Sequence, residues 1–187
     1  MRISANCSVL GLISGALAAG ICAFAACSVP ARAVAEELVL RGTLYEAGDF
    51  RVGERIPNCG RARTILTADL GDYGASIGAF IILNPQKLDR LSAATRLFVY
   101  SHECAHQLYG PGEERADCYA AKRGKAEGWL QPSDIDAVCR IFPHKSRSAE
   151  HPDRAARCAA IQACYASATR PTSAPSPVAT RDGQTYR

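Results

Sequence analysis

Residues 92–117 read SAATRLFVYSHECAHQLYGPGEERAD, and this stretch organises the rest of the chain. Ser92 is a typical helix N-cap residue, and the apolar side chains that follow it recur at helical spacing. The triplet Gly110-Pro111-Gly112 ends that pattern, because proline cannot continue a helix and glycine suits its C-terminal cap. The sequence therefore predicts a helix over 93–109 and a tight turn after it.

Strand patterns precede this helix and helical patterns follow it. Apolar and β-branched runs predict three short strands, at 38–44, 63–70 and 76–83. Other helices are predicted at Asn84-Pro85, over 113–123, and after Pro132 and Pro152. We expect Gly124 to close the second of these. Strands followed by helices indicate an α+β fold, in which a small antiparallel or mixed sheet is covered by helices.

The composition describes a chain of one folded domain. It has 187 residues, 21% of them charged, and a formal net charge of +4. This length suits one domain with its own core, and the apolar content excludes a wholly disordered chain. The 22 basic residues are set against 18 acidic ones and form no long run. We therefore expect no nucleic-acid partner.

The N-terminal segment 1–33 has the pattern of a secretory signal peptide. Arg2 supplies a positive start, 9–26 is uncharged and apolar, and a small-residue cleavage pattern ends at Ala33. Cleavage there predicts a secreted or periplasmic protein with no stable membrane span, and lowers the net charge to +2. A retained membrane anchor and a lipoprotein modified at Cys27 are the alternatives.

The cysteine count supports export. Of nine cysteines, three lie in the predicted signal peptide, which leaves six: Cys59, Cys104, Cys118, Cys139, Cys158 and Cys164. An even set in an exported chain is typical of a disulfide framework. The mature domain is then 34–167, and 168–187, rich in proline, serine and threonine, is expected to be a disordered tail.

The motif His102-Glu103-Cys104-Ala105-His106 indicates a metal site. Positions four apart share one face of a helix, so His102 and His106 can bind one zinc ion. Glu103, beside them, can accept a proton from a zinc-activated water as general base. The alternative is a packing or surface helix that carries two incidental histidines.

A catalytic zinc needs a third protein ligand, for which Glu113 is the first choice. It follows the tight turn that folds the chain back toward the histidines. Asp117, four residues on, is placed to accept the free N–H of His102 and so orient that ring. Asp117 or Glu114 as the third ligand, and Glu113 as a first-turn acid of its helix, remain alternatives.

These residues resemble a known family of metallopeptidases. His102-Glu103-Cys104-Ala105-His106 followed by Glu113-Glu114-Arg115-Ala116-Asp117 resembles the HExxH…ExxxD signature of gluzincins. The pair Ala116-Asp117 is most similar to the matching positions of the CAAX-prenyl and heat-shock zinc endopeptidases and of their soluble relatives, the minigluzincins. Residues 81–85 resemble the edge strand of that group. The resemblance covers about 78–124 and implies a zincin-like domain whose edge strand pairs with an extended substrate.

Two features depart from that family. The seven-residue step from His106 to Glu113 is shorter than in most gluzincins, and the third histidine of metzincins would fall at Gly112. The membrane helices of the larger relatives are absent.

Cys104 and Cys118 lie in the two ligand helices, and a disulfide joining those helices would fix the ligands. Ligation of a structural zinc by these thiols is the alternative. An oxyanion donor is sought among Tyr109, Tyr119, His144 and His151.

The sequence thus predicts an exported, monomeric zinc metallopeptidase that acts on a protein or peptide substrate. Hydrolysis would proceed without a covalent intermediate, with Glu103 as general base. A non-catalytic envelope protein that keeps a zincin scaffold or a structural metal site is the rival. An open position at the metal would favour the enzyme, and a fourth protein ligand would favour the rival. A cytosolic hydrolase, with the N-terminal segment retained, is a third possibility.

Overall fold

Short apolar runs separated by glycine-containing turns form the strands, and longer amphipathic segments form the helices. The computed structural model describes residues 42–145 and 152–169, so the predicted signal peptide and nearly all of the predicted tail lie outside the described residues. The elements in chain order are β1 Thr43–Tyr45, β2 Arg63–Leu66, β3 Gly74–Ile77, β4 Phe80–Leu83, α2 Pro85–Leu88, α3 Ala93–Tyr109, α4 Glu113–Ala126, the 3-10 turn η1 Pro132–Asp134, α5 Ile135–Arg140 and α6 Arg154–Ser167.

The strands form one four-stranded mixed sheet in the order β1-β2-β4-β3. β2 and β4 run parallel, and the outer strands β1 and β3 pair antiparallel with them. Ile65 on β2 and Ile81 to Leu83 on β4 are fully buried, because β2 and β4 are the inner strands of the sheet. The α+β class and the small mixed sheet predicted from the sequence are confirmed.

The strand predicted over 76–83 is wrong in its extent. Gly78, with a φ of +57°, turns the chain between β3 and β4, so the segment is a hairpin instead of one strand. The comparison of 81–85 with an edge strand is also wrong, since β4 lies between β2 and β3. The edge next to α3 is β3, whose last two residues, Ser76 and Ile77, fall at the start of the predicted strand.

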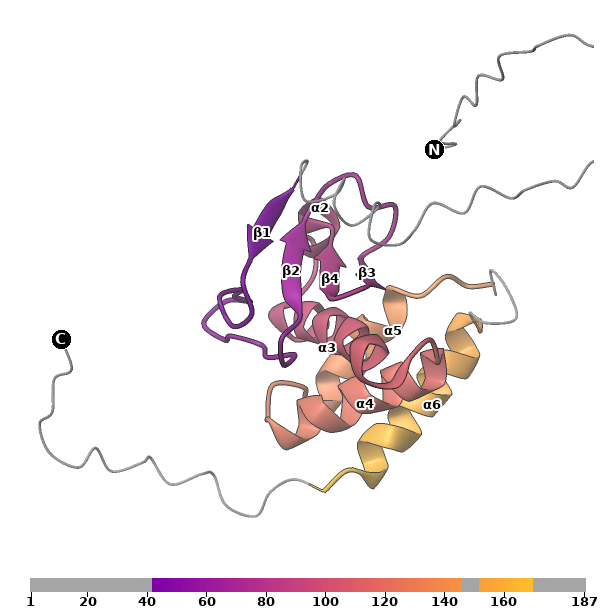
Figure 1. The fold of residues 1–187 in the computed structure, drawn as a ribbon. Coiled ribbons are helices and arrows are strands. Elements are labelled where there is room, and N and C mark those ends of the chain that lie inside the picture. The colour runs from indigo at the N-terminus through magenta and orange to yellow at the C-terminus, as the bar shows by residue number, and fades with distance from the viewer. Residues whose placement is uncertain (1–41, 146–151, 170–187) are drawn as a thin grey trace, which may run out of the picture.

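The helices are stacked in layers beneath the sheet (Figure 1). α3 packs against β3 and β4 on one side and against α4 on the other, and α6 packs on the far side of α4. The side chains of Phe98 on α3, Val138 on α5 and Ile161 on α6 are completely buried. This stacking places the N-terminal turn of α4 between α3 and α6.

Local signals set the ends of α3 as predicted. The Ser92 hydroxyl accepts a hydrogen bond from the Thr95 N–H at 3.2 Å, and the helix ends at Gly110, whose φ is +82°. The predicted end of α4 at Gly124 is wrong, since α4 continues to Ala126. A Cβ on Gly124 would lie 2.6 Å from Cβ of Leu130, so this glycine is needed for close packing inside the helix.

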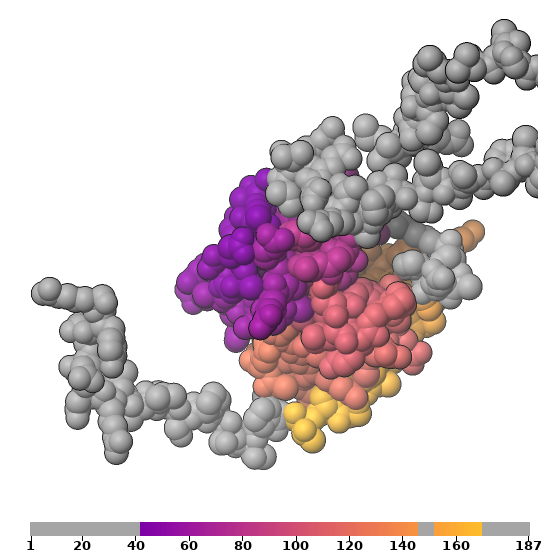
Figure 2. All heavy atoms as spheres, in the orientation of Figure 1, coloured from indigo at the N-terminus to yellow at the C-terminus, as the bar shows by residue number. Residues whose placement is uncertain are grey.

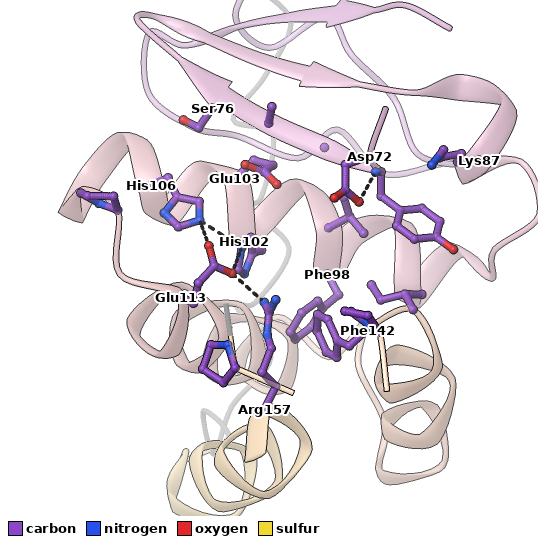
Figure 3. A pocket seen from close by; sticks show the side chains of 18 of the residues that line it. Asp72, Ser76, Lys87, Phe98, His102, Glu103, His106, Glu113, Phe142 and Arg157 are labelled. Atoms are coloured by element: carbon purple, nitrogen blue, oxygen red, sulfur yellow. Dashed lines mark hydrogen bonds and ion pairs between the residues drawn. The ribbon is translucent and has the colours of Figure 1, made fainter. Parts of the chain in front are cut away.

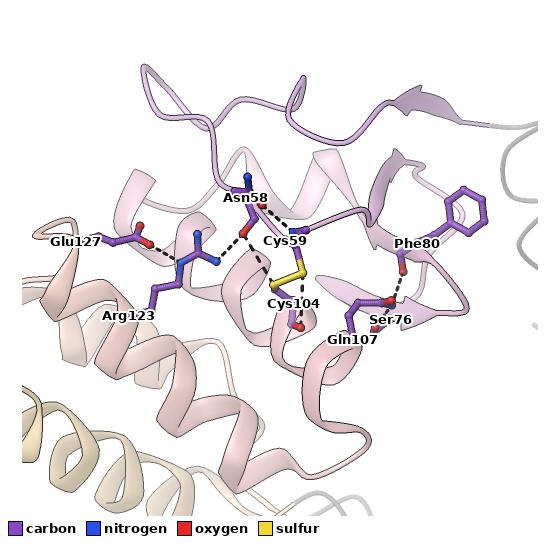
Figure 4. The surroundings of a disulfide bond; sticks show 9 residues. Asn58, Cys59, Ser76, Phe80, Cys104, Gln107, Arg123 and Glu127 are labelled. Carbon is purple, nitrogen blue, oxygen red and sulfur yellow. Dashed lines mark hydrogen bonds and ion pairs between the residues drawn. A yellow bond between two sulfur atoms is a disulfide. The ribbon is translucent and has the colours of Figure 1, made fainter. Parts of the chain in front are cut away.

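Three disulfides link the described cysteines. They join Cys59 to Cys104, Cys118 to Cys164 and Cys139 to Cys158. The expected disulfide between the two ligand helices is therefore wrong: Cys104 on α3 pairs with the loop before β2 (Figure 4), and Cys118 on α4 pairs with α6. Each ligand helix is nevertheless anchored by one bond.

Disulfides persist in oxidising environments, so the three bonds indicate an extracellular or periplasmic setting. Among the described residues, no helix has the length and apolar character that a membrane crossing requires.

Candidate metal centre

The tight turn between α3 and α4 brings three metal-ligating side chains together (Figure 3). His102 and His106 project from one face of α3, and Glu113 is the first residue of α4. The Nε2 atoms of the two imidazoles lie 3.0 Å apart, and each lies 3.4 Å from one oxygen of Glu113. Glu114, the neighbouring acid, is exposed and lies outside this group.

Contacts on the far side of each ring indicate which imidazole nitrogen carries the proton. Nδ1 of His106 lies 3.0 Å from the carbonyl oxygen of Gly110. Nδ1 of His102 lies 2.9 Å from Oδ1 of Asp117, although the ring is turned from the ideal hydrogen-bond angle. Carboxylate and carbonyl oxygens accept, so in neutral rings both Nδ1 atoms carry the proton. The two Nε2 lone pairs then point at each other and at a carboxylate.

Such a convergence of acceptors is stabilised by a positive charge between them, which a metal ion or a proton can supply. A tetrahedral ion with ligands at 2.0–2.1 Å separates its ligand atoms by about 3.3–3.4 Å. The distance from Nε2 of His102 to Oε2 of Glu113 and that from Nε2 of His106 to Oε1 are both 3.4 Å, close to this spacing, and the 3.0 Å between the imidazoles is slightly shorter. The residues present therefore fit a metal ion bound by two imidazoles and a carboxylate.

In the metal-free protein, protons take the place of that cation. Burial disfavours the His102 imidazolium, but hydrogen bonds to Asp117 and Glu113 outweigh it and raise its pKa to about 10. The hydrogen bond to Glu113 also raises the pKa of His106. Burial disfavours the Glu113 carboxylate, yet its bonds to the two histidines hold its pKa well below the usual range.

Glu103 lies beside the two histidines on α3 and outside the ligand group. It is 7% exposed, and its side chain is packed against β3 at Gly74. Burial raises the pKa of Glu103, although the imidazoles of His102 and His106 partly oppose this. A carboxyl group with a raised pKa next to a metal site is suited to accepting and returning a proton near neutral pH.

Sequence reasoning missed Arg157, which completes the site from α6. Its guanidinium donates two hydrogen bonds of 2.7 Å to the two oxygens of Asp117, and Nη2 lies 3.0 Å from Oε2 of Glu113. The guanidinium also lies 3.9 Å from the centre of the Phe142 ring. A signal was present in the sequence: Arg157 lies on the same helical stripe as Ile161 and Cys164, where an apolar residue is expected.

His102, His106 and Glu113 line a cavity of about 860 Å³ between β3 and the helices. Figure 3 shows the ligand group at one side of this cavity and Phe98, Phe142 and Lys87 at the other. The edge strand β3 borders it along Gly74, Ala75 and Ser76. Gln107 fixes that border, because its side-chain amide donates to the Ser76 hydroxyl and, at 3.2 Å, to the Phe80 carbonyl.

The predicted oxyanion donors do not meet at the site. Tyr109, Tyr119 and His144 are not among the residues that line the cavity, and His151 lies outside the described residues. Tyr109 is half exposed and packs edge-on against Tyr119, with ring centres 5.6 Å apart.

Comparisons of the chain with known proteins found no relative. No family model, no curated protein and no solved structure matches the chain. The chemistry of the site therefore has to be argued from its own residues.

Proposed function

We propose that the protein is a zinc-dependent peptidase whose ion is held by His102, His106 and Glu113. The observation that carries the proposal is the convergence of these three side chains at a cavity wall beside a buried carboxylate, Glu103. Two imidazoles and one carboxylate form a donor set that zinc favours in hydrolases. Zinc bound there would lower the pKa of a water molecule toward neutrality and polarise a carbonyl group.

The roles of the chain's own residues follow from their positions. Glu103 accepts the proton of the attacking water and returns it to the leaving amine, which suits the raised pKa that burial gives this carboxyl. Asp117 orients the ring of His102 through Nδ1, and the Gly110 carbonyl does the same for His106. Each ligand is thus held by a second contact.

An extended peptide is the substrate that the cavity favours. β3 is one of the two edge strands of the sheet within the described residues, and it borders the cavity along Gly74, Ala75 and Ser76. A peptide backbone can therefore add to β3 by strand pairing and bring a scissile bond toward Glu103 and the histidines. An exported peptidase with this arrangement resembles a small zincin.

The rival role, a structural metal site without catalysis, is less well supported. Structural zinc sites are closed by a fourth protein ligand, whereas the group found among the described residues has three members and faces a cavity. An unused coordination position and a neighbouring acid are features of hydrolytic sites.

The test combines metal analysis with two matched variants. We expect one zinc per purified chain and peptide hydrolysis that Glu103→Gln abolishes while zinc content is kept. Glu114→Gln is the control, because Glu114 is an exposed acid one residue after the third ligand. Absence of bound zinc, or full hydrolysis by the Glu103→Gln variant, would contradict the proposed function.

A further inference from the structure

One guanidinium contacts two carboxylates at the candidate metal site: Glu113, one of the three candidate ligands, and Asp117. Asp117 is completely buried, and the side chain of Glu113 is 13% exposed. Both are on α4, and both contact Nη2 of Arg157, at 2.7 Å for Asp117 and 3.0 Å for Glu113. A buried carboxylate without a partner is costly, so this arrangement depends on a positive charge that is always present.

Arginine meets that requirement better than a metal ion or a protonated histidine does. Its charge does not depend on metal supply or on physiological pH. The guanidinium contacts both oxygens of Asp117 and Oε2 of Glu113. Oε2 also lies 3.4 Å from Nε2 of His102, whereas Oε1 lies 3.4 Å from Nε2 of His106. Stacking on the Phe142 ring, at 3.9 Å, fixes the plane of the guanidinium.

The helix that carries Arg157 is itself held in place. Cys164 binds α6 to Cys118 on α4, and Cys158, the residue after Arg157, is bonded to Cys139 on α5. Ile161, one turn after Arg157, is completely buried. The position of the guanidinium relative to α4 is therefore fixed by covalent bonds and by packing.

From this geometry we propose that Arg157 is a positioning residue that keeps Glu113 and Asp117 in their metal-binding arrangement in the absence of metal. Its contact with Oε2 limits the part that this oxygen of Glu113 can take in metal binding, and its two hydrogen bonds maintain Asp117 as the acceptor that orients His102. This role deepens the proposed function and rests on the metal site described there. Arg157 acts through Glu113 and Asp117, so its proposed role is positioning and not catalysis.

The test compares Arg157→Met and Arg157→Lys with Arg154→Met. Arg154 lies one turn earlier on α6 and donates to the backbone carbonyls of Phe142 and Arg140, so it is a matched structural arginine away from the ligands. Thermal unfolding is measured with chelator and with saturating zinc, and the visible spectrum is recorded with cobalt in place of zinc. Cobalt absorption reports the number and geometry of its ligands.

We expect zinc to raise the Tm of Arg157→Met by at least about 5 °C more than it raises that of the wild type, because the metal then replaces the missing cation. The cobalt spectrum should change, since Oε2 of Glu113 loses its contact with the guanidinium. Arg154→Met should lose similar stability with and without zinc and keep the wild-type spectrum. Arg157→Lys keeps the charge but cannot span both carboxylates, so its spectrum should also change.

The outcomes separate this inference from the proposed function. A wild-type protein that binds neither zinc nor cobalt overturns both. A wild-type protein that binds them, with Arg157 variants that match Arg154→Met in zinc response and spectrum, overturns the role of Arg157 alone. If Arg157→Met does not fold without metal, Arg157→Lys decides through its cobalt spectrum.

Discussion

The α-carbon of Gly74 on β3 faces the side chain of Glu103 on α3 so closely that no larger residue fits between them. A methyl group on Gly74 would lie 2.8 Å from Cγ and 2.8 Å from Oε1 of Glu103. The edge strand thus holds the proposed general base in place by direct contact. The same strand borders the cavity, so in the proposed peptidase the binding of substrate would be linked to the position of Glu103.

Substitution Gly74→Ala should therefore damage catalysis without removing the metal. Displacement of Glu103 by about 1 Å is expected to lower kcat/KM by about 100-fold, while zinc content stays at the wild-type level. Gly71→Ala is the control, because a methyl group there meets nothing within 4 Å. Peptide hydrolysis and zinc content measured on both variants test this, and an unimpaired Gly74→Ala enzyme would contradict it.

The helix that carries the histidines was predictable because its determinants are local. Ser92 caps its start and Gly110-Pro111 stops it, and both signals act within a few residues of the helix ends. The spacing of His102 and His106 on that helix then follows from helical geometry. The same reasoning reached Glu113, because only a short turn separates it from the histidines.

Interactions between distant segments were not predictable in this way. The sheet order depends on which strands pair, and the parallel pairing of β2 with β4 joins segments that are not adjacent in sequence. Arg157 meets Asp117 across 40 residues, and each disulfide joins two different elements. Six cysteines allow 15 pairings, so spacing alone does not select the observed one.

The raised pKa of His102 predicts an unusual pH dependence for the metal-free protein. Its folded-state pKa of about 10 exceeds the unfolded value of about 6.5, so the folded state binds the proton more tightly. The resulting stability is fully present below about pH 6.5 and is lost as the pH rises toward 10. In chelator, the free energy of unfolding should fall by a few kcal/mol across this window, measured by urea titration at several pH values.

Two variants show whether His102 is the source of this slope. His102→Gln should remove most of it, because glutamine has no proton to lose in that range. His144→Gln should keep it, since His144 is exposed and is not part of the ligand group. With saturating zinc the slope should disappear or reverse, because the metal needs the deprotonated ring. If the free energy of unfolding of His102→Gln fell over this pH range as much as that of the wild type, the prediction would be wrong.

The Cys118–Cys164 bond should contribute more stability than the Cys139–Cys158 bond. The first closes a sequence separation of 46 residues and the second one of 19. Loop-closure entropy then gives about 4 kcal/mol for the first and about 3 kcal/mol for the second. Paired alanine substitutions, followed by urea unfolding in saturating zinc, measure both values, and equal or reversed losses would contradict this order.

Gly124→Ala should destabilise the protein, against the usual preference of helices for alanine. In an open helix the change would be stabilising by about 1 kcal/mol. Here the added methyl group would lie 2.6 Å from Cβ of Leu130 and 2.7 Å from the Trp129 ring, and both side chains are buried. Overpacking of this kind costs about 1–3 kcal/mol.

Trp129 is the single tryptophan of the chain, so its fluorescence reports on that contact directly. The emission maximum should shift in Gly124→Ala, and the midpoint of urea unfolding should fall. Lys122→Ala, an exposed change in the same helix, should leave both unchanged. If Gly124→Ala were as stable as the wild type, α4 would have to lie further from Trp129 and Leu130 than the structure places it.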